Sequence, residues 1–356
     1  MRSGIKLVLV VVMALTFTVN AQNYNCPELT DPNSFSMIVL PDPQNYSKFD
    51  TNQPIFELMT AWIVSQIDEL NIKAVVCTGD LVEQNSWIIP DGINGNQTGM
   101  EQWRSVSKAF ERLDNKVPYI ISPGNHDYGY KNGENRETHF HEFFPVERNS
   151  TWRNHLVSTF PSQLGELTLE NAAFEFDMPY WGKMLIIATE FAPRDEVLTW
   201  IKELVAHEKY AKHRAVFLTH SYLKSNGDRI TAEDYKMSPA NYGEAIWNKL
   251  IYPSSNIEMV ICGHYALIGG YEMNVGQRVD ENASGKKVFQ MMFNAQTLGG
   301  GWHGNGGDGW LRILEFLPDG KTMKVKTYSP FFGYSELTSH LANRREPYDE
   351  FEVVFD

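Results

Sequence analysis

The sequence predicts an α/β protein, and three observations support this. Short apolar runs recur along the chain, each of strand length, rich in Val and Ile, and ending at a cluster of polar residues. Segments in which apolar residues follow helical spacing lie between several of these runs. The resulting alternation of strand and helix is typical of a largely parallel sheet with helices on its faces.

Six of the runs are expected to be buried strands that end at functional loops: FSMIVLPDPQ, IKAVVCTGDLVE, VPYIISPGNHD, KMLIIATEF, HRAVFLTHSY and IEMVICGHY. After Gly299 the glycine-rich run GGGWHGNGGDGW precedes two further strand-like runs, LRILEFL and MKVKTYSP. These two are expected to complete the sheet by antiparallel pairing. The sequence assigns no structure to residues 331–356.

Helices are expected where apolar residues recur on one side of a 3.6-residue period. The expected helices run from Pro54 to Leu70, Glu101 to Leu113, Glu196 to His207 and Tyr242 to Leu250. No internal repeat or long low-complexity tract interrupts this order.

The N-terminus has the pattern of a signal peptide. Arg2 and Lys6 precede the apolar run LVLVVVMALTFTV, and small residues follow near Ala21. The run is shorter than the roughly 18 to 20 apolar residues of a membrane anchor. We expect cleavage of residues 1–21, a secreted or periplasmic protein, and no transmembrane segment in the mature chain.

The mature chain is acidic. Removing Arg2 and Lys6 from the 31 basic residues leaves 29 against 44 acidic ones, a formal net charge of −15. A surface of this charge repels polyanions, so we expect no nucleic acid partner. Three cysteines are too few for a disulfide framework. Cys77 and Cys262 are interpreted as buried small residues, with a disulfide between them as the alternative.

The predicted strands end in side chains that bind metals. Carboxylate, amide and imidazole ligands suit magnesium and first-row divalent metals, and the strand ends lack the thiolates of structural zinc sites. In chain order these side chains are Asp42, Gln44, Asp80, Asn125, His126, Asp127, His220 and His264.

The order of the motifs resembles that of the calcineurin-like metallophosphoesterase superfamily. The motifs are DPQ, GDLVE, GNHD, a strand ending in His220, and the Gly-His pair of CGHYA, and they cover roughly residues 35 to 270. The resemblance implies a four-layer fold, in which a central β-sandwich of mixed sheets is flanked by helices. It also implies one domain over residues 35–330, with a lead-in at 22–34, irregular insert loops at 84–99 and 128–170, and a C-terminal tail at 331–356 that packs on the domain.

The resemblance also implies a role for each residue. Asp80 would bridge two metal ions, and Asn125, His220 and His264 would complete the shell of the second ion. Asp42 and Gln44 would face the first ion from one side of an extended segment. His126 would contact the phosphate or protonate the leaving oxygen, and Asp127 would orient its ring. For Glu83, a structural contact beneath the site is the alternative to a functional role. Hydrolysis would then proceed by attack of a metal-bridging hydroxide on phosphorus.

Two positions depart from the family pattern, and both concern the first metal. Gln44 replaces the histidine of the usual DxH motif, and Ala266 replaces the second histidine of GHxH. We therefore expect two divalent ions, from Mn²⁺, Mg²⁺, Ca²⁺, Fe²⁺ and Zn²⁺, with a weaker first site that favours Mn²⁺, Mg²⁺ or Ca²⁺. His303 or water would supply the ligand that Ala266 lacks.

The expected partner is a small-molecule phosphomonoester or phosphodiester. The irregular segments are expected to form its pocket walls, because loops over a rigid sheet usually carry recognition. The candidates for these walls are Trp87, Trp103, Tyr128, Tyr130, His139, His141 and Trp152. The alternative function is a catalytically degenerate protein that binds a phosphorylated ligand without turnover. The sequence leaves the natural substrate and the oligomeric state open.

Overall fold

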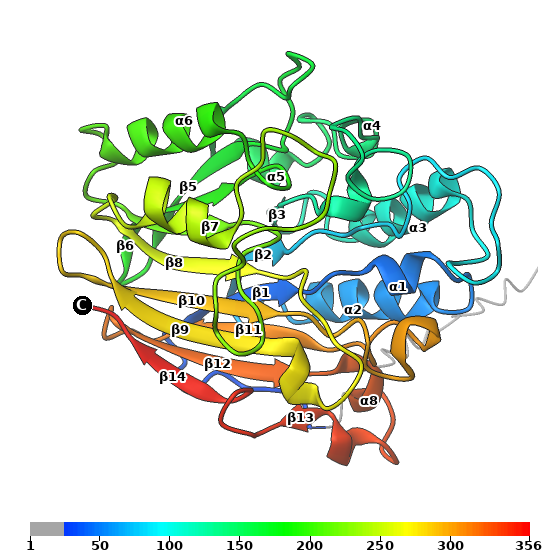
Figure 1. Cartoon of the computed structure of the whole chain (residues 1–356). Coiled ribbons are helices and arrows are strands. Elements are labelled where there is room, and N and C mark those ends of the chain that lie inside the picture. Colours follow the sequence, from blue (N-terminus) through cyan, green and yellow to red (C-terminus); the bar gives the residue numbers. More distant parts are fainter. Residues whose placement is uncertain (1–24) are drawn as a thin grey trace, which may run out of the picture.

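The computed structural model describes residues 25–356, which form two mixed β-sheets with seven strands each. The sheets pack against each other and helices cover their outer faces (Figure 1). The signal peptide expected over residues 1–21 lies outside the described residues. No helix among the described residues combines the length and the hydropathy needed to cross a bilayer.

In the first sheet the strands pair in the order β13-β12-β11-β1-β2-β3, and β14 also pairs with β12. Strands β1, β2 and β3 run parallel, whereas β11 is antiparallel to both β1 and β12. The bounds are β1 Phe35–Leu40, β2 Ile72–Cys77, β3 Tyr119–Ile121, β11 Leu311–Phe316, β12 Thr322–Tyr328, β13 Asn343–Arg344 and β14 Phe351–Val354.

In the second sheet the order is β4-β5-β6-β7-β8-β10-β9. Strands β6, β7, β8 and β10 run parallel, and antiparallel pairs complete both edges. The bounds are β4 Leu156–Thr159, β5 Ala172–Met178, β6 Gly182–Ala188, β7 Arg214–Leu218, β8 Ile257–Cys262, β9 Val275–Glu281 and β10 Lys287–Phe293.

The helices begin at residues with recognisable start signals. Helix α2 (Gln53–Ser65) has a proline in its first turn, which suits the fixed φ of that residue. Helix α3 (Gly99–Glu111) begins at a capping box between Thr98 and Glu101, an arrangement worth about 1 kcal/mol. The other helices are α1 Gln44–Ser47, α4 Phe140–Phe143, α5 Ser150–Arg153, α6 Asp195–Ala206, α7 Gly243–Ile246 and α8 Pro330–Gly333.

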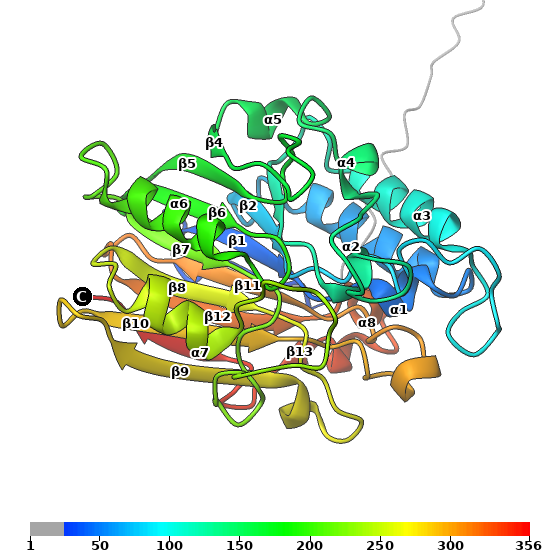
Figure 2. The same cartoon turned by 45° about the horizontal axis from the view of Figure 1, so that its top comes forward.

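Alternation along the strands divides the apolar side chains between two cores. On β10, Phe289 and Met291 join the core shared by the two sheets and by helices α2 and α3. Val288 and Met292 point into a second core beneath α6 and the π-helical turn that follows α7. Figure 2 shows α6 and α7 lying over the second sheet. The order of layers is therefore helix, sheet, sheet, helix.

The fold class predicted from the sequence is confirmed, and all six predicted buried strands are present as β1, β2, β3, β6, β7 and β8. Helix α2 is shorter than predicted. It ends at Ser65, where the N–H of Gln66 turns to the carbonyl oxygens of both Trp62 and Ile63. The tail that the sequence left unassigned supplies β13 and β14 to the first sheet.

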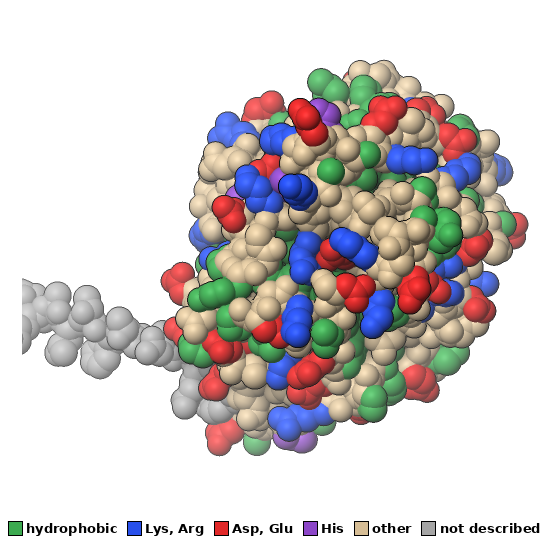
Figure 3. Space-filling model, turned by 90° about the vertical axis from the view of Figure 1, so that its left-hand side faces the viewer, with side chains coloured by type: hydrophobic (Ala, Val, Ile, Leu, Met, Phe, Trp, Pro, Cys, Tyr) green, Lys and Arg blue, Asp and Glu red, His purple; other side chains and the backbone are tan. Residues whose placement is uncertain are grey.

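Two further expectations concern thiols and charge. Cys77 and Cys262 are both buried free thiols, in different apolar cores, so the alternative of a disulfide between them is wrong. On the face shown in Figure 3, acidic and basic side chains are interspersed.

Candidate metal centre

The carboxyl ends of the parallel strands of both sheets meet at one place. Asp42 follows β1, Asp80 follows β2, and the Asn125–Asp127 turn follows β3 in the first sheet. His220 follows β7 and His264 follows β8 in the second sheet. A group of potential metal ligands, Asp80, His220 and His264, has its ligand atoms within 4.8 Å of one another. The strand ends predicted to hold a metal therefore converge from both sheets.

The histidines of this group present lone pairs to a common point. The Nδ1 atom of His220 lies 2.6 Å from the carbonyl oxygen of Thr78, which accepts only, so Nδ1 carries the proton. The Nε2 atom of His264 lies 2.7 Å from a carboxylate oxygen of Glu233 and carries its proton for the same reason. In the neutral rings the opposite nitrogens, His220 Nε2 and His264 Nδ1, are therefore acceptors.

Two more acceptors complete the group. The Oδ1 atom of Asn125 lies 3.1 Å from His220 Nε2 and 3.0 Å from His264 Nδ1. An oxygen of Asp80 lies 3.1 Å from His220 Nε2, and the two histidine nitrogens are 3.1 Å apart. When both rings are neutral, four lone-pair donors face one another, and a proton or a metal cation between them stabilises this arrangement.

These spacings fit a divalent ion. Ligands about 2.1 Å from a metal and at right angles to each other are about 3.0 Å apart. The mixed nitrogen and oxygen donors suit a first-row divalent metal. Asp80, Asn125, His220 and His264 are therefore the residues that would hold the second ion.

The backbone at this centre is strained. Asp80 has φ 47° and His264 has φ 66°, in the left-handed region that non-glycine residues rarely adopt. Gly263, which precedes His264, is required by close packing, because a Cβ there would lie 2.1 Å from Asp42 Oδ1. Such strain costs of order 1–3 kcal/mol per residue and is typical of functional sites.

The charges of the cluster favour a cation. Burial opposes protonation of His220, but Asp80 and Asp42 outweigh it and raise its pKa to about 10. Burial also opposes ionisation of Asp80, yet His220 and His126 hold the pKa of this carboxyl well below its usual range. The site is thus built to keep a positive charge beside an ionised Asp80.

Asp42 is held firmly at the edge of this cluster. Its Oδ2 accepts hydrogen bonds from the backbone N–H of His264 at 2.8 Å and from the Asn294 amide at 2.7 Å. Its Oδ1 accepts one from the Thr78 hydroxyl at 2.7 Å. Burial and the neighbouring Asp80 raise the pKa of Asp42 to about 6. Since both lone pairs of Oδ2 are used, only Oδ1 retains one for a metal.

Gln44 differs from its expected geometry but offers a donor. It begins helix α1 and does not continue an extended segment from Asp42, so the period-two argument for its orientation is wrong. Its Nε2 donates to Glu83 Oε2 at 3.0 Å, whereas its buried Oε1 has no partner among the described residues. This oxygen is the free donor that Gln44 presents in place of a histidine.

His303, one of the two proposed substitutes for the missing histidine, lies away from the cluster. His303 is exposed on a 3-10 turn, with its ring centroid 6.5 Å from that of Phe49, and within residues 25–356 it forms no hydrogen bond to the cluster. Asn294 lies closer, since its amide donates to Asp42 Oδ2 and, at 3.1 Å, to the carbonyl oxygen of His264. It ties these two segments together as a hydrogen-bond donor.

His126 and Asp127 lie on the turn after β3. The backbone N–H of His126 donates to Asp80 Oδ1 at 3.0 Å, and its Nδ1 lies 2.5 Å from the carbonyl oxygen of Glu83. Although burial favours the neutral ring, Asp80 and Glu83 raise the pKa of His126. The ring is thus fixed through Nδ1, which leaves Nε2 for a ligand.

The hydrogen bond expected from Asp127 to the His126 ring is wrong, because the carbonyl of Glu83 takes that place. Asp127 accepts from the backbone N–H groups of Leu81 and Gly124, each at 2.8 Å. Burial and the neighbouring Asp80 raise its pKa to about 7. Asp127 therefore braces the two loops that present Asp80 and Asn125, and Glu83 has the structural contact considered as its alternative.

Sequence reasoning missed Glu233 and Asn294. Asn294 follows β10, and the apolar run KVFQMMF before it is a signal of the same kind as the six strands that were predicted. Glu233 lies in the irregular segment between β7 and α7, and nothing in its sequence surroundings indicates that it contacts His264.

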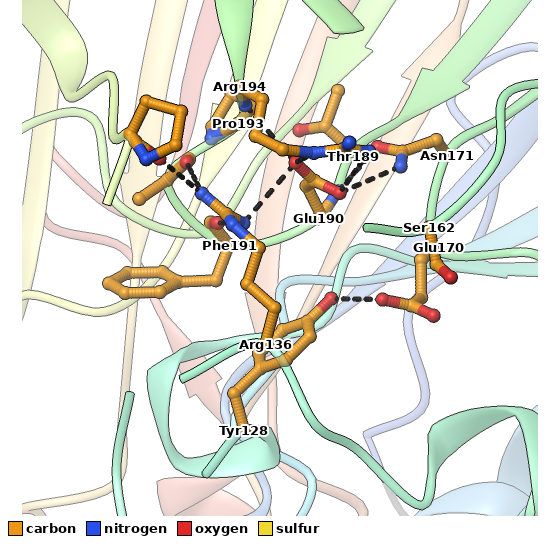
Figure 4. Close-up of polar contacts among 12 residues, drawn as sticks. Tyr128, Arg136, Ser162, Glu170, Asn171, Thr189, Glu190, Phe191, Pro193 and Arg194 are labelled. Atoms are coloured by element: carbon orange, nitrogen blue, oxygen red, sulfur yellow. Dashed lines mark hydrogen bonds and ion pairs between the residues drawn. The ribbon is translucent and has the colours of Figure 1, made fainter. Parts of the chain in front are cut away.

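Figure 4 shows a buried network of polar contacts around Arg136 and Glu190. The guanidinium of Arg136 donates to the carbonyl oxygens of Phe191, Ala192 and Pro239, at 3.0, 2.8 and 2.6 Å, and pairs with Glu190 at 3.2 Å. The ring of Phe191 lies against His220, with centroids 5.8 Å apart. Arg136 thus fixes two loops that pack on His220 and His264.

The residues expected to form pocket walls differ in burial. Trp103, Tyr128 and Trp152 are fully buried, so for these residues the pocket-wall prediction is wrong. Trp87 stacks on Tyr130 with ring centroids 6.1 Å apart, and Lys131 lies 4.1 Å from the Trp87 ring. A cavity of about 460 Å³ adjoins the cluster between residues 132–134 and 233–236.

Comparisons with known proteins agree with this geometry. A family model described as calcineurin-like phosphoesterase matches residues 36–266. The uncharacterized protein YvnB of Bacillus subtilis (strain 168) is 28% identical over 302 residues, which cover 83% of this chain and 20% of the relative. The chain therefore spans about one fifth of the length of that relative.

Two solved structures resemble this chain at low sequence identity. GAP50, the anchor in the inner membrane complex of Plasmodium, is 11% identical with a TM-score of 0.52, over 91% of this chain and 89% of that one. A dimetal phosphatase from Danio rerio is also 11% identical, with a TM-score of 0.49, over 90% of this chain and 99% of that one. At this identity the likeness concerns the fold alone.

Proposed function

Because the chain belongs to the calcineurin-like phosphoesterase family, we propose that it is a metal-dependent phosphoesterase that hydrolyses a small-molecule phosphomonoester or phosphodiester. The observation that carries the proposal is the convergence of four potential metal-ligand atoms, from Asp80, Asn125, His220 and His264, on one point. Such a site would bind a cation, and bound divalent cations promote phosphate ester hydrolysis by activating water and stabilising charge on the phosphate.

Divalent ions, when bound, lower the pKa of water and neutralise charge on the phosphate. Asp80 lies at the centre of the cluster and has a second oxygen, Oδ1, on the side of His126. Asp42 Oδ1 and Gln44 Oε1 are the remaining donors for a first ion, which would have oxygen ligands only. Oxygen ligation of this kind favours Mn²⁺, Mg²⁺ or Ca²⁺ there.

His126 is the residue proposed to act on the substrate. Its ring is fixed by the carbonyl of Glu83 through Nδ1, and its backbone N–H is bonded to Asp80. The Nε2 atom is thereby left to hold a phosphate oxygen or to deliver a proton to the leaving oxygen. Asp127 acts on the loops rather than on the ring.

The test combines metal analysis with two reporters. Purified protein is analysed for bound metal and then assayed with an aryl phosphate and a bis-aryl phosphate, each with Mn²⁺, Mg²⁺, Ca²⁺ or Zn²⁺ added. We expect metal-dependent hydrolysis of at least one reporter. Absence of hydrolysis with every metal, together with sub-stoichiometric metal binding, would contradict the enzyme proposal.

A specific observation favours the alternative of a binding protein without turnover. Both lone pairs of Asp42 Oδ2 are taken by hydrogen bonds, and Ala266 provides no ligand. A protein of this kind would bind one ion in the cluster of Asp80, Asn125, His220 and His264. The same metal analysis and reporter assays separate the two functions. The binding protein is expected to bind metal and to hydrolyse neither reporter.

We further propose that the protein is exported. The support is the basic start, the apolar run of signal length and the small-residue exit near Ala21. N-terminal sequencing of the protein recovered from outside the cytoplasm of its source cell tests this. A mature N-terminus close to residue 22 is the expected result.

A further inference from the structure

Glu233 meets the metal centre from a segment without any recognised motif. Its Oε1 lies 2.7 Å from His264 Nε2, and its Oε2 accepts a hydrogen bond from the Ser221 hydroxyl at 3.1 Å. Each carboxylate oxygen therefore has one partner, and Ser221 is the residue next to the ligand His220. The carboxylate links the two histidine-bearing loops.

This contact decides which nitrogen of His264 can bind a metal. A carboxylate accepts hydrogen bonds, so it places the proton of the neutral ring on Nε2. The lone pair of Nδ1 is then directed toward Asn125 Oδ1 and His220 Nε2, at 3.0 and 3.1 Å. Without the carboxylate, the neutral ring would distribute its proton between the two nitrogens and rotate more freely.

The loop that carries Glu233 is held in place at several points. The ring of Tyr235 lies 6.2 Å from the His264 ring and 5.2 Å from the Phe191 ring. Arg136 binds the Pro239 carbonyl oxygen at 2.6 Å, at the end of the same loop. These contacts reduce the entropy that Glu233 would otherwise lose when it orders against the histidine.

We propose that Glu233 is a positioning residue that fixes the tautomer and orientation of His264 for metal binding. The inference rests on the proposed function in one respect, namely that a divalent ion binds at this cluster. Groups that orient a metal-binding histidine typically change metal affinity by about 10- to 100-fold when removed. Glu233 would therefore act on the metal through His264, without touching it.

The experiment compares three variants of the full chain with the wild type. Glu233→Ala removes the acceptor, Glu233→Gln keeps a neutral acceptor of the same length, and Asp234→Asn is the control, since Asp234 is exposed on the same loop. Mn²⁺ affinity is measured by titration calorimetry. The tautomer of His264 is read from long-range ¹H–¹⁵N spectra of the metal-free protein.

We expect Glu233→Ala to bind Mn²⁺ about 10- to 100-fold more weakly and to lose the Nε2–H tautomer. Glu233→Gln should retain the tautomer and lose less affinity, and Asp234→Asn should match the wild type. Wild-type affinity and tautomer in Glu233→Ala would overturn the inference, as would equal losses in Asp234→Asn. A wild type that binds no Mn²⁺ would overturn both the positioning role of Glu233 and the proposed metal-dependent function. Normal Mn²⁺ binding without hydrolysis would contradict only the proposed phosphoesterase activity.

Discussion

The Nε2 atom of His220 and the Nδ1 atom of His264 lie 3.1 Å apart, and when both rings are neutral each presents a lone pair to the other. Their opposite nitrogens are committed to the Thr78 carbonyl and the Glu233 carboxylate. Two acceptors at this distance repel each other unless a proton or a metal ion lies between them. This pair, contributed by neighbouring strands of the second sheet, is the centre of the proposed metal site.

Removal of one of these rings should abolish tight metal binding. His220→Ala deletes a donor and leaves Asp80 with less positive charge around it. The loss of Mn²⁺ affinity should exceed the roughly 10- to 100-fold typical of groups that only orient a ligand. Calorimetry and metal analysis measure this. His303→Ala is the matched control, because His303 is exposed and should leave binding unchanged; a change there would indicate that His303 reaches the site.

His126→Ala should separate metal binding from turnover. The ring contacts the Glu83 carbonyl and none of the four converging acceptor atoms through its side chain. Metal content should stay at the wild-type level, while turnover of an aryl phosphate falls by about 10²-fold or more, as expected for loss of an acid catalyst. If the variant loses its metal, the assignment of His126 as a residue that acts on the substrate is wrong.

Ala266→His restores the position at which the family pattern has its second histidine. The new imidazole should raise Mn²⁺ affinity at the first site, because an added nitrogen donor supplements Asp42 and Gln44. Metal stoichiometry at limiting Mn²⁺ measures the effect. Unchanged stoichiometry would mean that another group already serves this position.

The Arg136 network should be important for folding. Arg136 and Glu190 have side chains only 4% and 1% exposed, so Arg136→Met would leave three buried carbonyl oxygens without this donor and Glu190 with Arg194 as its remaining cation. We expect a loss of unfolding free energy of about 3 kcal/mol or more, measured by denaturant titration. Lys108→Ala, at an exposed ion pair with Glu111, is the control and should cause no measurable change. An equal effect in both variants would contradict the prediction.

Glu170 should make stability depend on pH. Burial raises its pKa above the ordinary value of 4.5, against the lowering effect of hydrogen bonds from Tyr128 and Thr168. The folded state therefore binds this proton more tightly than the unfolded state. Its contribution to stability is present at low pH and is lost as pH rises from the unfolded toward the folded pKa.

Glu170→Gln removes this titration while keeping a polar group of the same size. The unfolding free energies of the variant and the wild type are compared at a series of pH values. The variant should become more stable relative to the wild type as pH rises above about 4.5, because only the wild type loses the contribution of Glu170. A difference between the two proteins that stays constant with pH would show that Glu170 does not titrate in this way.

The sequence by itself indicated the family, the layered α/β architecture and the candidate residues of the second metal site. These follow from local signals: apolar runs of strand length, and ligands at the residues where those runs stop. His220 and His264 are examples, because they follow β7 and β8, and strand direction alone brings the ends of parallel strands of one sheet to one edge. Asp42 was also found in this way, although its hydrogen bonds were not.

Only the tertiary structure decided which groups surround these ligands. Asn294 reaches Asp42 across 252 positions of sequence and Glu233 reaches His264 from an irregular loop. Gln44 begins a helix. Asp127 braces two loops, because backbone N–H groups need acceptors where the chain turns. Hydrogen bonds between distant segments depend on the packed arrangement of both sheets. The periodicity and motifs of a single segment do not contain that information.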